Sequence, residues 1–199
     1  MVKYIFSGWL NVDYRTLGIF RFLLGLVCFL DIFRRLPYIE AFYSNNGVAS
    51  NFFMSEIGSK YSTKAFSLLS SFGGVWEVSI FFYIALLFSF FLMIGYRTKL
   101  SHIITIITIL SIHNRLIILE NGGDLVLNNF LIWSAFFPLG KRFSFDRLRY
   151  LLKRHKDSTP SSLNSGDLIA ENEPRNYWGL AYFACLLQLS IIYFFNYMN

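Results

Sequence analysis

Charged residues are scarce in this chain: Asp, Glu, Lys and Arg make up 15% of its 199 residues. Soluble domains usually carry about a quarter charged residues. Hydrophobic residues make up 55% of the chain, aromatic residues make up 20%, and the mean hydropathy is +0.47. This balance disfavours a soluble globular protein and predicts an integral membrane protein.

Cysteine is also scarce, and a secretory signal is lacking. Cys28 and Cys185 both lie within apolar runs, where a disulfide framework is not expected and a small buried side chain is. The N-terminal segment contains Asp13 and Arg15 and has no small-residue cleavage site. The sequence therefore predicts no secretory signal peptide.

The common catalytic signatures are absent from the sequence. It contains no glycine-rich phosphate loop, no G-x-S-x-G, no Cys pair and no H-E-x-x-H. Three scattered histidines make a zinc site improbable on spacing alone. The residues thus predict no metal and no cofactor. Because the basic residues flank apolar runs, the net charge of +6 does not indicate a nucleic-acid partner either.

What the chain does contain is five apolar runs, where a bilayer core of about 30 Å needs about 20 mostly apolar residues per helix. The runs are continuous and do not alternate in ten-residue segments, which disfavours membrane strands. We therefore expect an all-α polytopic membrane bundle of about five transmembrane helices, forming a single domain over 1–199. The fourth run is short and polar, so it is expected to be tilted or partly spanning. The runs are 17–36, 76–95, 100–119, 125–139 and 177–197.

The basic residues predict the orientation of this bundle. Nearly all loop lysines and arginines fall on one face of a five-span arrangement, whereas Lys60 and Lys64 fall on the other. Since basic loops stay in the cytoplasm, the N-terminus is predicted to be cytoplasmic and the C-terminus external. The segment 141–176 is then a cytoplasmic loop. Its basic amphipathic part, 141–156, is expected to lie against anionic lipid, and 157–176 is expected to be a flexible linker.

A charge at membrane depth costs at least a few kcal/mol, so ionisable residues inside the runs need a reason. Arg21 lies near the cytoplasmic end of the first run and is expected to snorkel toward the interface. Asp31 precedes Arg34 and Arg35 by three and four positions, which places them on one helix face. These three residues are predicted to form a local structural ion pair at the external interface.

The third run carries a polar stripe that indicates a face turned toward protein or a water-filled cavity. Hydrogen bonds between helices would explain its hydroxyl groups. They explain His113, Asn114 and Arg115 less well, because three consecutive strong donors exceed what packing requires. The stripe consists of Ser101, Thr105, Thr108 and Arg115.

The turn ENGGD leads directly from the third run into the fourth, where Asp124 and Asn128 are four residues apart. The turn is short, so Asp124 is expected within reach of His113 or Arg115, where it would orient the imidazole. Gln188 of the last run could complete a polar interior. The sequence leaves two readings open: a substrate pocket opening to the external side, with His113 and Asn114 as catalytic candidates, or purely structural hydrogen bonding.

Several stretches together resemble the HTTM family, the membrane domain shared by vitamin K-dependent gamma-carboxylase and its bacterial relatives. Within that family the chain is most similar to the sporulation-delaying protein B type. The matching stretches are VDYRTLGIFRFLLGLVCFLDIFRR (12–35), AFYSNNGV (41–48), IGYRTKLS (94–101), SIHNRLIILENGGDLVL (111–127), FFPLGKRFSFD (136–146) and LLQLSIIYFFN (186–196).

The resemblance implies a multi-pass helical bundle in the bacterial cytoplasmic membrane. It implies that His113 and Asn114 match a His-Asn motif that contributes to the active site in the carboxylase branch. In the sporulation-delaying branch, the implied role is to help mature an exported peptide toxin together with a small partner protein. A quinone cofactor of the vitamin K type is implied by the resemblance alone.

One departure from the family limits the expected chemistry. The lysine that serves as catalytic base in the carboxylases has no counterpart here, since the last lysine is Lys156. The chain is therefore expected to be a truncated or split member without carboxylase activity of its own, with another chain supplying the rest. The alternatives are a non-enzymatic subunit that docks another membrane chain and, less favoured because paired interrupted helices are missing, a small transporter.

Overall fold

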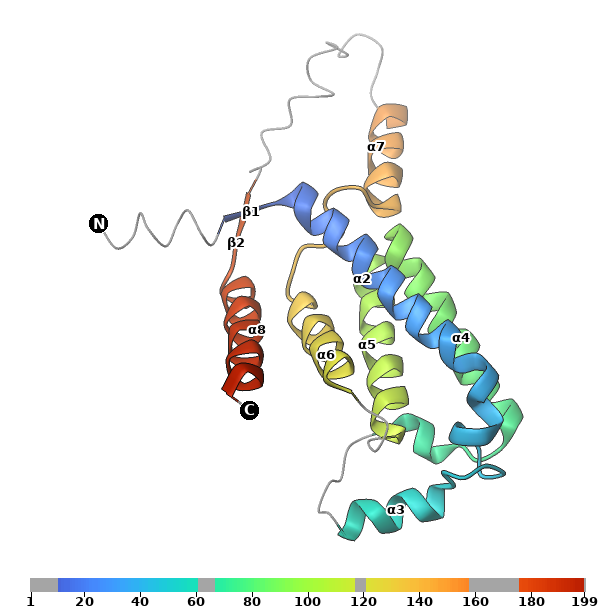
Figure 1. Cartoon of the computed structure of the whole chain (residues 1–199). Coiled ribbons are helices and arrows are strands. Elements are labelled where there is room, and N and C mark those ends of the chain that lie inside the picture. Colours follow the sequence, from blue (N-terminus) through green and yellow to red (C-terminus); the bar gives the residue numbers. More distant parts are fainter. Residues whose placement is uncertain (1–10, 61–66, 117–120, 158–175, 199) are drawn as a thin grey trace.

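The structure is a computed structural model that describes residues 11–60, 67–116, 121–157 and 176–198. The predicted all-α fold is confirmed, because every apolar run forms a helix in these ranges (Figure 1). The longer helices are α2 (Tyr14–Arg35), α3 (Asn51–Lys60), α4 (Val75–Ile94), α5 (Thr98–Arg115), α6 (Gly122–Ser134), α7 (Phe145–Asp157) and α8 (Leu180–Met198). The short ones are η1 (Leu36–Tyr38), η2 (Ile39–Tyr43) and η3 (Leu68–Ser71).

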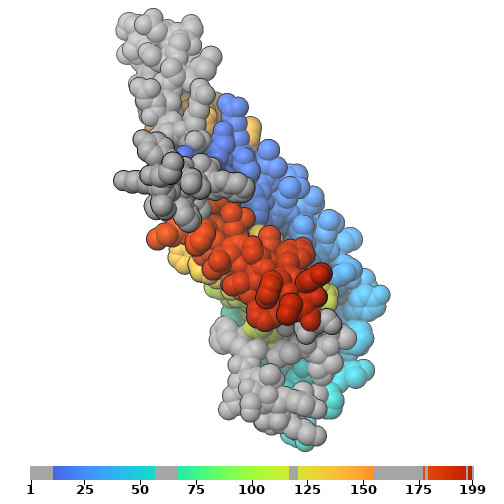
Figure 2. All heavy atoms as spheres, turned by 60° about the vertical axis from the view of Figure 1, so that its left-hand side comes forward, coloured from blue at the N-terminus to red at the C-terminus, as the bar shows by residue number. Residues whose placement is uncertain are grey.

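Helices α2, α4 and α5 form the centre of the bundle, with α4 packed on both of the others. Small residues allow α2 and α4 to approach closely: a Cβ atom added at Gly25 would lie 2.7 Å from the backbone nitrogen of Met93. Helix α6 packs on α5, and α8 packs on α6. In Figure 2, α8 lies on the outside of the bundle. The core contains both cysteines, which are buried and unpaired as predicted.

Arg21 does not snorkel, and that expectation is wrong. Its side chain is only 1% exposed and donates to three carbonyl oxygens, those of Leu92 (2.8 Å), Met93 (3.1 Å) and Phe143 (2.7 Å). The last carbonyls of a helix lack intrahelical donors and attract cations. Arg21 therefore closes the C-terminal end of α4, where Gly95 turns the chain with φ of 79°.

A short antiparallel pairing joins β1 (Asn11–Asp13) to β2 (Asn176–Trp178), with Val12 opposite Tyr177. These strands were not predicted from the sequence, because three residues are too few to show an alternating pattern. The pairing joins the segment before α2 to the segment before α8, which are far apart in the chain (Figure 1).

The structure describes only part of the segment 141–176 that was predicted to be a cytoplasmic loop. Most of its basic segment forms α7, which exposes three leucines and three basic residues: Leu148, Leu151, Leu152, Arg149, Lys153 and Arg154. Residues 158–175 of the expected linker lie outside the described residues.

Two stretches within the described residues are long and apolar enough to cross a bilayer. They are Tyr14–Tyr43, which comprises α2, η1 and η2, and Val75–Ile94, which is α4. The apolar part of α8, Leu180–Phe195, is shorter. Helix α6 has 13 residues and measures roughly 20 Å at 1.5 Å per residue. The described residues thus form an all-helical bundle in which two stretches are long and apolar enough to span a bilayer.

Candidate functional site

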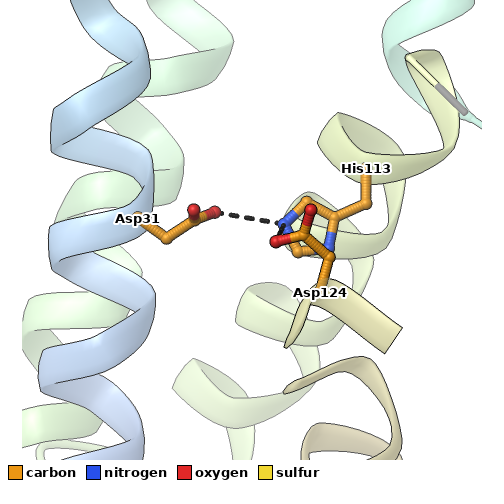
Figure 3. Close-up of side chains that lie close together, drawn as sticks. All are labelled: Asp31, His113 and Asp124. Atoms are coloured by element: carbon orange, nitrogen blue, oxygen red, sulfur yellow. Dashed lines mark hydrogen bonds and ion pairs between the residues drawn. The ribbon is translucent and has the colours of Figure 1, made fainter. Parts of the chain in front are cut away.

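Six polar side chains meet where α2 ends, α5 ends and α6 begins, and we call them the polar cluster. Figure 3 shows three of them, Asp31, His113 and Asp124, pointing toward one another from these three helices. The full cluster consists of Asp31 and Arg35 on α2, Tyr43 on η2, His113 on α5, and Asp124 and Asn128 on α6.

His113 lies at the centre of the cluster and is 2% exposed. Its Nε2 atom is 3.1 Å from Oδ2 of Asp31, and its Nδ1 atom is 2.9 Å from Oδ1 of Asn128. A carboxylate oxygen only accepts hydrogen bonds, so a proton on Nε2 is donated to Asp31. Both ring nitrogens have partners, and the imidazole is therefore held in one orientation.

Arg35 binds both carboxylates of the cluster. Its Nε and Nη2 atoms donate to the two oxygens of Asp31 at 3.0 and 3.1 Å, which is a bidentate geometry. Nη2 also lies 3.2 Å from Oδ1 of Asp124, and Nη1 donates to the Tyr43 hydroxyl at 3.0 Å. Arg34 contacts Asp31 at 3.0 Å from the outside, with 68% of its side chain exposed. Arg35 thus supplies the positive charge that two nearly buried acids require.

Asp124 also starts helix α6. Its Oδ2 atom accepts from the backbone nitrogen of Asn121 at 3.2 Å, while Oδ1 of Asn121 accepts from the nitrogens of Gly123 and Asp124. This reciprocal capping box satisfies the free N–H groups of the first turn. The ENGGD turn therefore places an acid near His113 because that acid also begins the next helix. The distance from Oδ1 of Asp124 to Nε2 of His113 is 3.9 Å.

The remaining predicted site residues lie apart from this centre. Arg115 is 1% exposed and donates to the carbonyl oxygens of Tyr43 (3.3 Å) and Ala49 (3.1 Å). It therefore holds the segment after η2 and lies away from Asp124. Asn114 is only half-buried. Gln188 lines a small cavity between α6 and α8, beside Asn129, and does not join the cluster.

The polar stripe of α5 faces the protein interior, as its periodicity predicts. Its hydroxyl groups donate to carbonyl oxygens of α5 itself or of the turn that precedes it, as Thr105 does to Ser101 at 2.8 Å. His102 forms a separate buried contact with the Ser134 hydroxyl at 3.1 Å. The stripe therefore packs helices together and does not line an open chamber along the length of α5.

The cluster has the dimensions of a metal site. One ligand atom each from Asp31, His113 and Asp124 can be chosen so that all lie within 4.8 Å of one another. Oxygen and imidazole donors of this kind suit divalent ions. However, the guanidinium of Arg35 already contacts both carboxylates, so a metal ion would have to displace it. The geometry describes an arginine-neutralised acid pair more directly than a metal centre.

A pocket of about 360 Å³ adjoins the cluster and gives it an outlet. Arg35 and Tyr43 belong both to the cluster and to the pocket wall, so they connect the buried imidazole to the outside. The pocket combines two guanidinium groups with aromatic and aliphatic surface. Its lining residues are Arg34, Arg35, Tyr38, Phe42, Tyr43, Leu116 and Asn121.

The predicted ion pair of Asp31 with Arg34 and Arg35 is present. The further contacts of Asp31 with His113 and of Arg35 with Asp124 were not predicted. A signal for this existed in α2. Leu24, Gly25, Cys28 and Ile32 recur at helical spacing and are buried, and Arg35 continues the same face.

Comparisons of the chain with protein-family models, curated proteins and solved structures find no match.

Proposed function

We propose that this chain is an integral membrane protein of about five spans in the bacterial cytoplasmic membrane. Its polar cluster would help to mature an exported peptide at the external side. Support for the membrane placement comes from the outward-facing surface, where α2, α4, α5 and α8 all expose large apolar side chains. Contiguous exposed apolar surface of this kind is unusual in soluble monomers and ordinary in lipid.

The observation that carries the functional proposal is the imidazole of His113, fixed between a carboxylate and an amide from two other helices. Polar groups buried at membrane depth are costly and are kept mainly at functional sites. An imidazole paired with a carboxylate is also suited to moving protons. The resemblance to the HTTM family, which places its His-Asn motif at these positions, supports the same assignment and implies a peptide substrate and a small partner protein.

A substrate would first meet the pocket wall. His113 itself is enclosed, whereas Arg34, Arg35 and Tyr43 line the pocket. Two guanidinium groups favour a substrate segment that bears a carboxylate, because arginine matches that group in charge and shape. A carboxylate bound there would contact Arg35, and the contacts of Arg35 with Asp31 and of Asp31 with His113 would connect it to the imidazole. The proposed connection from a bound substrate to the imidazole of His113 therefore runs through Arg35 and then Asp31.

The test is to replace His113 with alanine and compare the exported peptides by mass spectrometry. Cells that produce the unaltered chain and cells that produce the variant are compared at equal membrane abundance. We expect at least one exported peptide to fall by about 100-fold, as losses of a proton-transferring group commonly cost. His113→Gln, which can keep one hydrogen bond, is expected to restore abundance without restoring the peptide.

His102 provides the matched control, since it is also a buried histidine of α5 but lies outside the polar cluster. His102→Asn is expected to leave the exported peptides unchanged. An unaltered peptide profile in His113→Ala cells with normal amounts of protein would contradict the proposed function.

A second candidate function is a docking subunit for another membrane chain, and the position of α8 favours it. Helix α8 lies at the edge of the bundle, packs mainly on α6, and leaves much of its apolar surface exposed (Figure 2). Affinity purification in mild detergent is expected to retain a membrane partner that is lost when Leu187, Ile191 and Phe194 are changed to alanine. The same number of changes on α4, at Ile80, Tyr83 and Leu87, serves as the control. Docking through α8 would be excluded if the α8 variant and the α4 variant both purify with the same proteins as the unaltered chain, or if all three purify as monomers.

A further inference from the structure

A second and larger pocket lies at the opposite end of α5 from the polar cluster. It has a volume of about 710 Å³ and is formed by the first turns of α5 and the segment that follows α6. Lys99 and His113 are fourteen positions apart on the same helix, which corresponds to roughly 20 Å. The two pockets are therefore separate sites. We call this one the basic pocket because Arg97, Lys99 and Lys141 line it.

The three cations of the basic pocket are exposed and have no carboxylate partner within the described residues. Lys141 lies 4.7 Å above the ring of Tyr14 and 3.5 Å from its hydroxyl, and neither group carries a negative charge. The single acid in the wall is Asp146. Its two oxygens accept from the backbone nitrogens of Arg97 and Thr98 and from the Thr98 hydroxyl, each at 2.8 Å.

Asp146 is thus already used to cap α5, and its charge is offset by the positive end of that helix. Asp146 also occupies the backbone N–H groups of Arg97 and Thr98, so these two donors do not bind the ligand. What remains for a ligand is a cavity with an excess of positive charge at its rim.

Apart from Thr98 and His102, the rest of the wall consists of apolar residues and Gly140. Leu100 is 46% exposed and Ile103 is 53% exposed, and Phe137 and Pro138 lie on the other side of the pocket. A soluble anion would gain nothing from this surface. A molecule with an anionic head and hydrocarbon chains would use both parts of the pocket at once.

We propose that the basic pocket binds an anionic phospholipid. The phosphate would lie among Arg97, Lys99 and Lys141, and an acyl chain would lie along Leu100 and Ile103. Basic pockets between helices at the cytoplasmic face are typical sites for anionic headgroups. Asp146 of the pocket wall belongs to the first turn of α7, and this helix contains further basic residues. The inference rests on the membrane placement proposed above and is independent of any role for His113.

The test uses the full chain purified in a neutral detergent and titrated with short-chain phosphatidylglycerol. Binding is followed by native mass spectrometry. Phosphatidylcholine of equal chain length tests the headgroup, and inorganic phosphate tests whether the anion alone suffices. We expect phosphatidylglycerol to bind and the other two to bind at least tenfold more weakly. Equal binding of phosphatidylcholine, or of phosphate alone, would overturn the proposal.

Variants locate the site. Each basic residue near a membrane surface contributes about 1 kcal/mol, so the double variant Lys99→Gln with Lys141→Gln is expected to weaken binding roughly 30-fold. Arginine at both positions is expected to preserve it. The matched control, Arg149→Gln with Lys153→Gln on exposed positions of α7, removes the same charge away from the pocket. An equal loss in this control would show a general surface effect and overturn the assignment to the pocket.

Discussion

Replacing Asp31 with asparagine is expected to lower the free energy of unfolding by about 3 kcal/mol or more. The change keeps the shape of the side chain but removes its charge. Arg35 then faces a neutral amide with a single accepting oxygen in place of a bidentate carboxylate, and His113 and Arg35 compete for that oxygen. Removing one charge of an enclosed ion pair is strongly destabilising, although Arg35 keeps its contact with Asp124. SDS titration of the protein in detergent micelles, followed by circular dichroism, measures the effect.

Arg34 offers the matched control for this change, because it contacts the same carboxylate from the exposed side. Exposed ion pairs contribute about 0–1 kcal/mol, so Arg34→Ala is expected to leave stability nearly unchanged. A loss below 1 kcal/mol in Asp31→Asn would show that the polar cluster does not depend on the charge of Asp31.

Arg21→Met is expected to cause the second largest loss, again about 3 kcal/mol. Methionine fills a similar volume but donates no hydrogen bond, so the carbonyl groups of Leu92, Met93 and Phe143 lose their shared donor. The segment that leads into α7 would also lose its attachment to α2. Limited trypsin digestion is therefore expected to cleave α7 faster in the variant, alongside the lower stability.

Two further variants separate the effect of the Arg21 charge from that of its hydrogen bonds. Arg15→Met removes a charge from the exposed start of α2 and is expected to stay within about 0.5 kcal/mol. Arg21→Lys keeps the charge, but an ammonium cannot span the three carbonyls as a guanidinium does, and we expect only partial recovery. Wild-type cleavage rates in Arg21→Met would show that Arg21 does not hold the segment near Phe143.

The helices of this bundle were predictable because their signal is local. The apolar run 76–95 differs by one residue at each end from α4, Val75–Ile94, which ends at the glycine turn. The short turn before Asp124 likewise indicated that this acid lies near His113. The fourth run, predicted as 125–139, corresponds less closely to α6, Gly122–Ser134, which begins at its capping box.

The partners across the bundle were not predictable in the same way. Asp31 and His113 are 82 positions apart, and their contact depends on how α2 lies against its neighbours. Periodicity shows which face of a helix is packed, but not which helix it meets. For Arg21 the decisive partner is the end of α4, which no pattern around position 21 reveals. The paired strands were missed because three residues carry no readable alternation.

Asp124 gives its two oxygens to different tasks, one to the opening turn of α6 and the other to Arg35. An incoming carboxylate that competed for this guanidinium would release one oxygen of Asp124, while the other oxygen accepts the hydrogen bond that begins the helix. Occupancy of the pocket and the stability of the first turn of α6 are therefore expected to be thermodynamically linked through a single side chain. Binding in the pocket would then be detectable as a change in the stability of the first turn of α6.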